Sequence, residues 1–177
     1  MRTKDLSALG LLLLLAGCVS IPDSYAPPIQ RQPVYGPEGT ELKPYVAMND
    51  PYAELHIAGG VSKALEGGTW RWTSEKAELK FAPAVHTNQK LRVEFAVAEN
   101  TFPSTGPITL TLTVNGKALD KVRYDSAGQK RFEKPVPSAW MLPSLENFVV
   151  IEVDKPWVSP KDGAKLGVIL LGAGFVE

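Results

Sequence analysis

The chain has 177 residues, of which 44% are apolar, and its 19 lysine and arginine residues balance its 19 aspartate and glutamate residues. This length and apolar content suffice for one sizeable hydrophobic core. Lysine and glutamate alternate along the chain without any block of like charge, so the sequence offers no basic surface for phosphates. We therefore expect one folded domain and no nucleic-acid partner.

The first 17 residues have the pattern of a cleavable signal peptide. Two basic residues precede an apolar run from Leu9 to Leu15, which is about half the ~20 residues that a membrane-spanning helix needs. Leu15-Ala16-Gly17-Cys18 then resembles the lipobox of bacterial lipoproteins, in which the cysteine is diacylated and the chain is cut just before it. The resemblance implies a signal peptide over residues 1–17 and a lipid on Cys18 that makes the membrane a partner of the mature chain.

Cys18 is also the only cysteine, so no intrachain disulfide is possible and the core alone must hold the domain. Two acyl chains on one residue anchor a protein stably, whereas a single chain holds it only marginally. Val19 stands where lipoproteins retained at the inner membrane typically carry Asp. By this resemblance the protein belongs to the bacterial cell envelope, with the outer membrane favoured over the inner membrane, on either the periplasmic or the surface-exposed face.

Residues 18–52 are predicted to form a proline-rich tether. Seven prolines, from Pro22 to Pro51, break any regular element. Proline-rich segments tend towards an extended polyproline conformation of about 3.1 Å per residue. A tether of this length would hold a domain well clear of a lipid surface.

From residue 53 onward the alternation of apolar and polar residues predicts strands. In the clearest run, Ile108–Val114, four aliphatic residues alternate with three threonines. Asn115-Gly116 follows and predicts a tight hairpin, because both residues tolerate positive φ. The predicted strands are Ala53–Ile57, Thr69–Thr73, Ala77–Ala82, Leu91–Glu99, Ile108–Val114, Ala118–Tyr124, Lys130–Pro135, Phe148–Val153 and Leu166–Phe175.

These predicted strands, about nine in number, indicate an all-β fold. No window after residue 18 sustains a helical period over three turns. Nine antiparallel strands have two apolar faces to hide, and stacking two sheets hides both. The sequence therefore predicts an antiparallel two-sheet β-sandwich, jelly-roll-like, over residues 53–177.

Three short motifs follow one another along the predicted sandwich. They are Trp70-Arg71-Trp72 early, Val114-Asn115-Gly116 in the middle, and Pro160, Asp162 and Leu166-Gly167 before the last strand. With the segments between them, they resemble a group of uncharacterised bacterial lipoproteins. The same order is similar to the carbohydrate-binding-like sandwich modules appended to bacterial glycosyltransferases and glycoside hydrolases. The resemblance covers roughly residues 65–175 and implies a sandwich fold and a glycan ligand class, but no particular ligand.

Four tryptophans are the candidate ligand-binding residues. Trp70 and Trp72 share one side of a strand, where they either form a platform for a sugar ring or fill the core. The core is the favoured interpretation, with Arg71 facing solvent. Trp140 and Trp157 lie in predicted loops, where ligand residues are common, although plugging the open end of the sandwich is slightly favoured over ligand binding for each.

The sequence indicates neither a metal site nor an enzyme. Asp154 and Asp162 flank one loop, but calcium is coordinated by six to eight oxygens. Two carboxylates are too few, so we expect no metal and no cofactor. A turn at Asp162-Gly163, in which Asp162 bonds its own backbone, is the stronger expectation. The two histidines, His56 and His86, adjoin no nucleophile motif and are expected in turns or on the surface. Catalytic residues are therefore not assigned.

The favoured function is a lipid-anchored cell-envelope binding module for glycan or polysaccharide. The alternative is a structural or protein-interaction lipoprotein that docks on another envelope protein and has no small-molecule ligand. The glycan hypothesis gains if Trp140 and Trp157 line one groove, and it loses if both are buried against aliphatic side chains.

Overall fold

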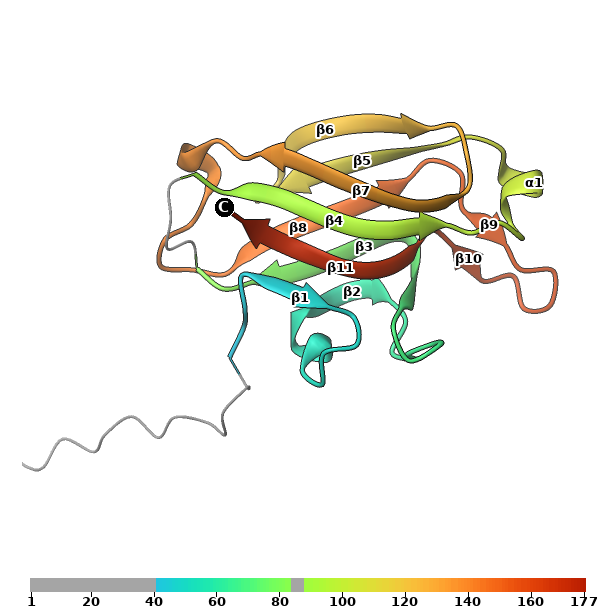
Figure 1. Ribbon diagram of the computed structural model, residues 1–177, viewed down its shortest axis with the longest axis horizontal. Helices are drawn as coiled ribbons and strands as arrows, with labels where there is room; N and C mark the ends of the chain where they lie inside the picture. The colour runs from blue at the N-terminus through green and yellow to red at the C-terminus, as the bar shows by residue number, and fades with distance from the viewer. Residues whose placement is uncertain (1–40, 84–87) are drawn as a thin grey trace, which may run out of the picture. The chain divides into compact units, whose positions relative to one another are not determined.

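The computed structural model describes residues 41–83 and 88–177, and almost all of this part is β-structure (Figure 1). The predicted signal peptide, Cys18, most of the predicted tether and His86 lie outside the described residues. Within them, no helix has both the length and the apolar character of a membrane-spanning segment.

The described residues form eleven strands, one α-helix of a single turn and two 3-10 helices. The strands are β1 (Tyr45–Ala47), β2 (Ile57–Val61), β3 (Arg71–Phe81), β4 (Lys90–Val97), β5 (Ile108–Val114), β6 (Lys117–Tyr124), β7 (Gly128–Pro135), β8 (Asn147–Val153), β9 (Trp157–Val158), β10 (Lys165–Leu166) and β11 (Ile169–Val176). The helices are η1 (Ala53–His56), α1 (Phe102–Thr105) and η2 (Ser138–Trp140).

Nine of these strands form one antiparallel sheet that curls over itself into two layers (Figure 1). The strand order is β6-β5-β8-β3-β11-β4-β7, with β1 added to β11 and β2 added to β3. The long strand β3 joins the layers, because Arg71 and Trp72 pair with β11 whereas Lys76–Phe81 pair with β8. The predicted antiparallel β-sandwich is therefore confirmed.

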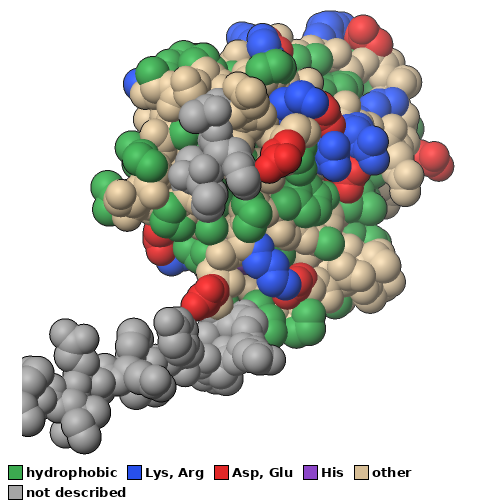
Figure 2. Space-filling view, turned by 60° about the vertical axis from the view of Figure 1, so that its left-hand side comes forward, with side chains coloured by type: hydrophobic (Ala, Val, Ile, Leu, Met, Phe, Trp, Pro, Cys, Tyr) green, Lys and Arg blue, Asp and Glu red, His purple; other side chains and the backbone are tan. Residues whose placement is uncertain are grey.

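Basic and acidic side chains are intermixed on the face of the domain that Figure 2 shows. Ion pairs join neighbouring strands, such as Arg92 to Glu133 at 2.8 Å between β4 and β7 and Lys76 to Glu152 at 3.3 Å between β3 and β8. Exposed pairs of this kind contribute about 0–1 kcal/mol each. The stability of the domain must therefore come from its core.

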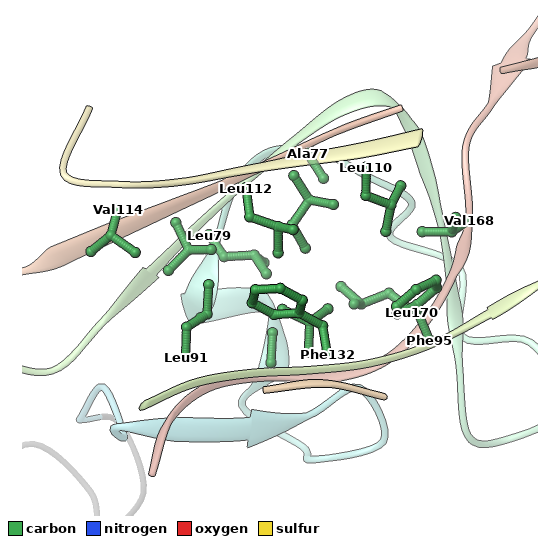
Figure 3. Packing of buried hydrophobic residues seen from close by; sticks show 14 of the residues in the cluster. Ala77, Leu79, Leu91, Phe95, Leu110, Leu112, Val114, Phe132, Val168 and Leu170 are labelled. Atoms are coloured by element: carbon green, nitrogen blue, oxygen red, sulfur yellow. The ribbon is translucent and has the colours of Figure 1, made fainter. Parts of the chain in front are cut away.

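The core lies between the two layers and is made of alternate residues of each strand. In β5 the four aliphatic side chains are buried and the three threonines are half-buried on the outer face. Leu110 and Leu112 point inward from this layer toward Phe95 and Leu170 of the other layer (Figure 3). The alternation predicted for Ile108–Val114 is confirmed.

Several predicted strands differ in detail from the observed ones. Ala53–Ile57 is mostly the 3-10 helix η1, and the runs at 69–73 and 77–82 belong to the single 11-residue strand β3. The run Leu166–Phe175 is interrupted at Gly167, whose N–H donates to the Thr73 carbonyl at 2.8 Å. A Cβ on Gly167 would lie 2.4 Å from the Ser74 carbonyl oxygen, so only glycine permits this close approach.

Strand β1 lies within the stretch that the sequence assigns to the tether, so the boundary at residue 53 is too late. Val46 and Met48 are buried, and β1 pairs with Gly172–Gly174 of β11. A Cβ on Gly174 would come within 2.3 Å of the Pro44 carbonyl oxygen. Prolines lie on either side of this three-residue strand and not within it. An edge strand tolerates proline at such positions.

Candidate functional site

Figure 1 shows α1 and the β9–β10 hairpin at one end of the sandwich. A groove between them contains the predicted site residue Trp157. Its volume is about 640 Å³. We call it the Trp157 groove; it is lined by Asn100, Ser104, Thr105, Lys155, Pro156, Trp157, Val158 and Pro160.

The first wall begins where β8 ends. The Asp154 carboxylate accepts a hydrogen bond from the Thr109 N–H at 2.7 Å, and the Asp154 N–H donates to the Thr109 carbonyl at 3.1 Å. Lys155 then donates from Nζ to the Pro107 carbonyl at 3.3 Å. These bonds fix the corner that presents Trp157 to the groove. Trp157 itself lies in β9, whereas the sequence placed it in a loop.

The hairpin behind Trp157 is held by its own turn. The Ser159 N–H donates to the Ala164 carbonyl, and the Gly163 N–H donates to the Ser159 carbonyl, both at 2.8 Å. Asp162 Oδ1 accepts the Ala164 N–H at 3.2 Å, and Gly163 has a φ of 72°. Hydrogen bonds from the Ser159 hydroxyl and the Ala164 N–H lower the pKa of Asp162. The turn predicted at Asp162-Gly163 is confirmed.

The second wall is the connection from β4 to β5, which carries α1. Its start is fixed at the Ala98 carbonyl, which accepts the Phe102 N–H at 3.0 Å and the Thr101 hydroxyl at 3.2 Å. Its end is fixed by the Gly106 N–H, which donates to the Phe102 carbonyl at 2.7 Å. Both walls of the groove are therefore held by hydrogen bonds within the protein.

The groove combines an aromatic ring with small polar side chains. Trp157 is half-buried, while Asn100 and Ser104 are exposed and bring an amide and a hydroxyl to the same groove. An indole face packs against the C–H face of a sugar, and amides and hydroxyls donate to and accept from its hydroxyl groups. Residues 41–83 and 88–177 contain no group of three His, Cys, Asp or Glu side chains that could hold a metal ion.

Trp140 does not share this groove. It ends η2, is half-buried and packs against the hydrophobic core. Its carbonyl accepts a hydrogen bond from Asn115 Nδ2 at 2.7 Å, and Lys117 Nζ lies 5.7 Å from the centre of its ring. The structure therefore divides the two tryptophans: Trp157 lines a groove, and Trp140 covers the core.

The motif Trp70-Arg71-Trp72 has the opposite orientation from the one that the sequence favours. Arg71 is 6% exposed, whereas both tryptophans are half-buried and pack edge to face with their ring centres 5.7 Å apart. The Arg71 guanidinium donates to the carbonyls of Met48 and Ser62, each at 3.3 Å, and to that of Lys63. Because these acceptors satisfy the buried charge, arginine takes the inner position and the tryptophans the outer one.

The motif Val114-Asn115-Gly116 does more than form a turn. Asn115 has a φ of 49°, as the hairpin requires, and its Oδ1 accepts the Phe148 N–H at 2.8 Å. Its Nδ2 also donates to Oδ1 of the fully buried Asn147 at 2.8 Å. Asn147 in turn holds Leu142 by two bonds, of 2.8 and 3.1 Å. This amide network fixes the loop that carries Trp140, a role that the turn signal alone does not reveal.

His56 is fully buried, which corrects the expectation of a turn or surface position. Its Nδ1 lies 2.9 Å from the Lys80 carbonyl, its Nε2 accepts the Lys43 N–H at 3.4 Å, and its ring packs on Phe81. Burial lowers the pKa of His56 despite the opposing effects of the Lys80 carbonyl and the Asp50 carboxylate. With both ring nitrogens directed at main-chain groups, His56 is a structural residue.

No protein-family model matches the chain, and no curated protein sequence matches it significantly. Among solved structures, it is similar to an exo-β-1,3-galactanase from Phanerochaete chrysosporium in complex with β-1,3-galactotriose, with a TM-score of 0.43 and 10% identity. That match covers 77% of this chain and 29% of the galactanase, so the chain spans less than a third of that protein.

The chain is also similar to a carbohydrate-binding module, CBM36, in complex with calcium and xylotriose. This match has a TM-score of 0.41 and 10% identity, and it covers 75% of this chain and 98% of the module. A family 35 carbohydrate-binding module from an environmental isolate matches with a TM-score of 0.41, 10% identity and coverage of 68% of this chain and 84% of that chain.

Proposed function

We propose that this protein is a lipid-anchored module of the bacterial cell envelope that binds glycan in the Trp157 groove. The observation that carries the proposal is the half-buried indole of Trp157, which lines an open groove of about 640 Å³ together with Asn100 and Ser104. Saccharide sites pair an aromatic surface with a few polar groups that fix orientation. Hydrogen bonds within the protein hold both walls in place before a ligand binds. Binding would therefore lose little conformational entropy of the protein.

The anchor is the second part of the proposal. Leu15-Ala16-Gly17-Cys18 supports cleavage before Cys18 and acylation of its thiol, and Val19 supports transfer to the outer membrane. The proline-rich stretch from residue 19 to residue 40 would then act as the tether between lipid and domain. Such a protein would hold a glycan-binding groove at a membrane surface.

The test is a binding assay on the full-length lipidated chain in detergent. A panel of xylan, β-1,3-glucan, β-1,4-galactan, cellohexaose and peptidoglycan would be screened, and any ligand titrated by its effect on tryptophan fluorescence. Trp157→Ala should weaken binding at least tenfold, which corresponds to about 1.4 kcal/mol. Trp157→Phe keeps an aromatic face and should lose less.

The matched control is Leu145→Ala, because Leu145 is 65% exposed and lies outside the groove. It should bind like the wild type, and all variants should unfold at similar temperatures. If the wild type binds none of the glycans in the panel, or if Trp157→Ala binds its ligand as tightly as the wild type does, the proposal of glycan binding in this groove is wrong. A wild type that binds no glycan but co-purifies stoichiometrically with one envelope protein would favour the docking alternative.

A further inference from the structure

Figure 1 shows β1, β11, β4 and β7 in one layer of the sandwich. A second cleft lies on the outer face of this layer. It measures about 380 Å³ and shares no residue with the Trp157 groove. We call it the sheet-face cleft; it is lined by Glu94, Phe95, Gln129, Lys130, Arg131 and Leu171.

A β-bulge in β11 shapes the floor of this cleft. The register between β11 and β4 shifts between Leu170 and Gly172, so Leu170 is buried while Leu171 is half-buried and lines the cleft. Bulges commonly re-aim a side chain at a functional surface in this way. Gly172 then leaves room for Tyr45, since a Cβ there would lie 2.3 Å from the phenolic oxygen.

The polar wall is a network of three side chains from three strands. The Tyr45 hydroxyl of β1 donates to Glu94 Oε2 of β4 at 2.8 Å. Arg131 of β7 donates to Glu94 Oε1 from Nε at 2.9 Å and from Nη2 at 2.7 Å. Burial raises the pKa of Tyr45 to about 12, and the bond from Tyr45 lowers the pKa of Glu94, so near neutral pH the carboxylate is charged and the phenol is not.

This network of three side chains offers donors and acceptors side by side without net charge, and the ammonium group of Lys130 is held away from it by the Ser126 hydroxyl and the Ala127 carbonyl. Glu94 and Arg131 neutralise each other, yet Arg131, whose side chain is 62% exposed, keeps Nη1 free of Glu94. The phenolic oxygen of Tyr45 can still accept, and the exposed Gln129 amide both donates and accepts. A vicinal diol presents the matching pattern, in which one hydroxyl donates to a carboxylate while its neighbour accepts from a guanidinium.

Beside the polar wall, three apolar residues of the outer face form a row that ends at Gln129. Ile169 pairs with Trp72 on one side and with Ala96 on the other, and Ala96 pairs with Gln129, so these four residues form one row across the sheet. Trp70 packs edge to face against Trp72 at the end of the row. A saccharide has both hydroxyl edges and apolar C–H faces, and this surface provides a counterpart for each.

We propose that the sheet-face cleft is a second saccharide site, specific for a neutral sugar that presents a vicinal diol to Glu94 and Arg131. This site rests on the proposal that the protein binds glycan, and it adds that the protein is bivalent. Two sites on one domain would hold a polysaccharide by two contacts, so that a long chain would bind more tightly than a short oligosaccharide.

The experiment is a calorimetric titration of the full-length lipidated chain in detergent with xylohexaose, laminarihexaose and cellohexaose. For the sugar that binds, the wild type should show two sites, and Arg131→Ala and Trp157→Ala should each leave one. Arg123→Ala is the matched control, because Arg123 is an exposed arginine of β6 that pairs with Asp125 away from the cleft. It should keep both sites.

Glu94→Gln keeps a side chain of the same shape but removes the charge that holds Arg131 and should also leave one site, so the result does not depend on a single variant. A wild type with one site that Trp157→Ala removes and Arg131→Ala leaves unchanged would overturn the second site while the proposed function stands. If none of the three sugars binds, the second site is wrong. The panel of polysaccharides and peptidoglycan then decides separately whether the Trp157 groove binds glycan.

Discussion

Buried polar side chains fix the main chain of this domain at its irregular places. Arg71 ties Met48, the residue after β1, to Ser62 in the β2–β3 connection. His56 links η1 to the segments on either side of it through Lys43 and Lys80. Removing such a group leaves its partners buried without hydrogen bonds, at about 1–3 kcal/mol for each orphaned group. Hydrogen bonds from single buried side chains therefore fix the segments that the hydrogen bonds of the sheet do not fix.

His56 makes the stability of the domain depend on pH. Because burial lowers its pKa in the folded state, the unfolded chain binds a proton at His56 below about pH 6.5, while the folded chain does not until lower pH. The unfolded state then binds more protons, so this part of the stability is present above pH 6.5 and is lost as the pH falls through that value. Urea midpoints of the wild type should therefore drop between pH 7.5 and pH 5.

The control is His56→Gln, whose amide can still bond to main-chain groups but does not titrate. This variant should be less stable at pH 7.5, with a smaller drop between pH 7.5 and pH 5 than the wild type shows. The carboxylates with lowered pKa, such as Asp50 and Glu94, lose their contribution at more acid pH, outside this window. Equal drops in the two proteins would show that His56 is not the group responsible.

At the scale of elements, strands with one buried face were predictable and those set by tertiary contacts were not. Ile108–Val114 is predicted to the residue, because every second side chain is buried. The three residues of β1 are too few for a period, and Gly172 and Gly174 of β11 decide their pairing. The middle of β3 has the adjacent exposed residues Glu75 and Lys76, which break the alternation and divide one strand into two predicted ones.

The candidate site was predictable only in part, for a related reason. Trp157 is noticeable in the sequence because a tryptophan outside the periodic runs needs an explanation. Asn100 and Ser104 carry no such signal, and only the fold brings their connection beside β9. The network of Tyr45, Glu94 and Arg131 joins strands far apart in sequence, so no local pattern could indicate it.

The alternation in β5 leads to a direct test of the sandwich. Leu110 is fully buried in the core, while Thr111 is half-buried on the outer face beside Glu152 of β8. Leu110→Ala should cost about 3–5 kcal/mol, a large part of a total stability of about 5–15 kcal/mol. Thr111→Ala should cost about 1 kcal/mol or less. Chemical denaturation of the full-length chain measures both, and coincident midpoints would mean that the inward face is assigned wrongly.

At the scale of the whole molecule, the chain has one thiol, and that thiol has a single predicted use. Cys18 closes the motif Leu15-Ala16-Gly17-Cys18, so acylation would consume the only group able to form a disulfide. A sandwich with a continuous core between two layers needs no such crosslink. We therefore expect the membrane attachment and the stability of the domain to be separable by mutation.

Cys18→Ser is the change that separates them. Without the thiol no diacylglycerol can be attached, so the variant expressed in its bacterial host should not incorporate radiolabelled palmitate and should not appear as the mature lipoprotein in the outer-membrane fraction. Val19→Ala leaves the thiol in place and should be labelled like the wild type. The variant domain should still unfold at the wild-type denaturant midpoint, because Cys18 precedes Val46, the first core residue in the part of the chain that the structure describes. Palmitate labelling that persists in Cys18→Ser would show that the lipid lies elsewhere, and the tethered arrangement proposed for this protein would be wrong.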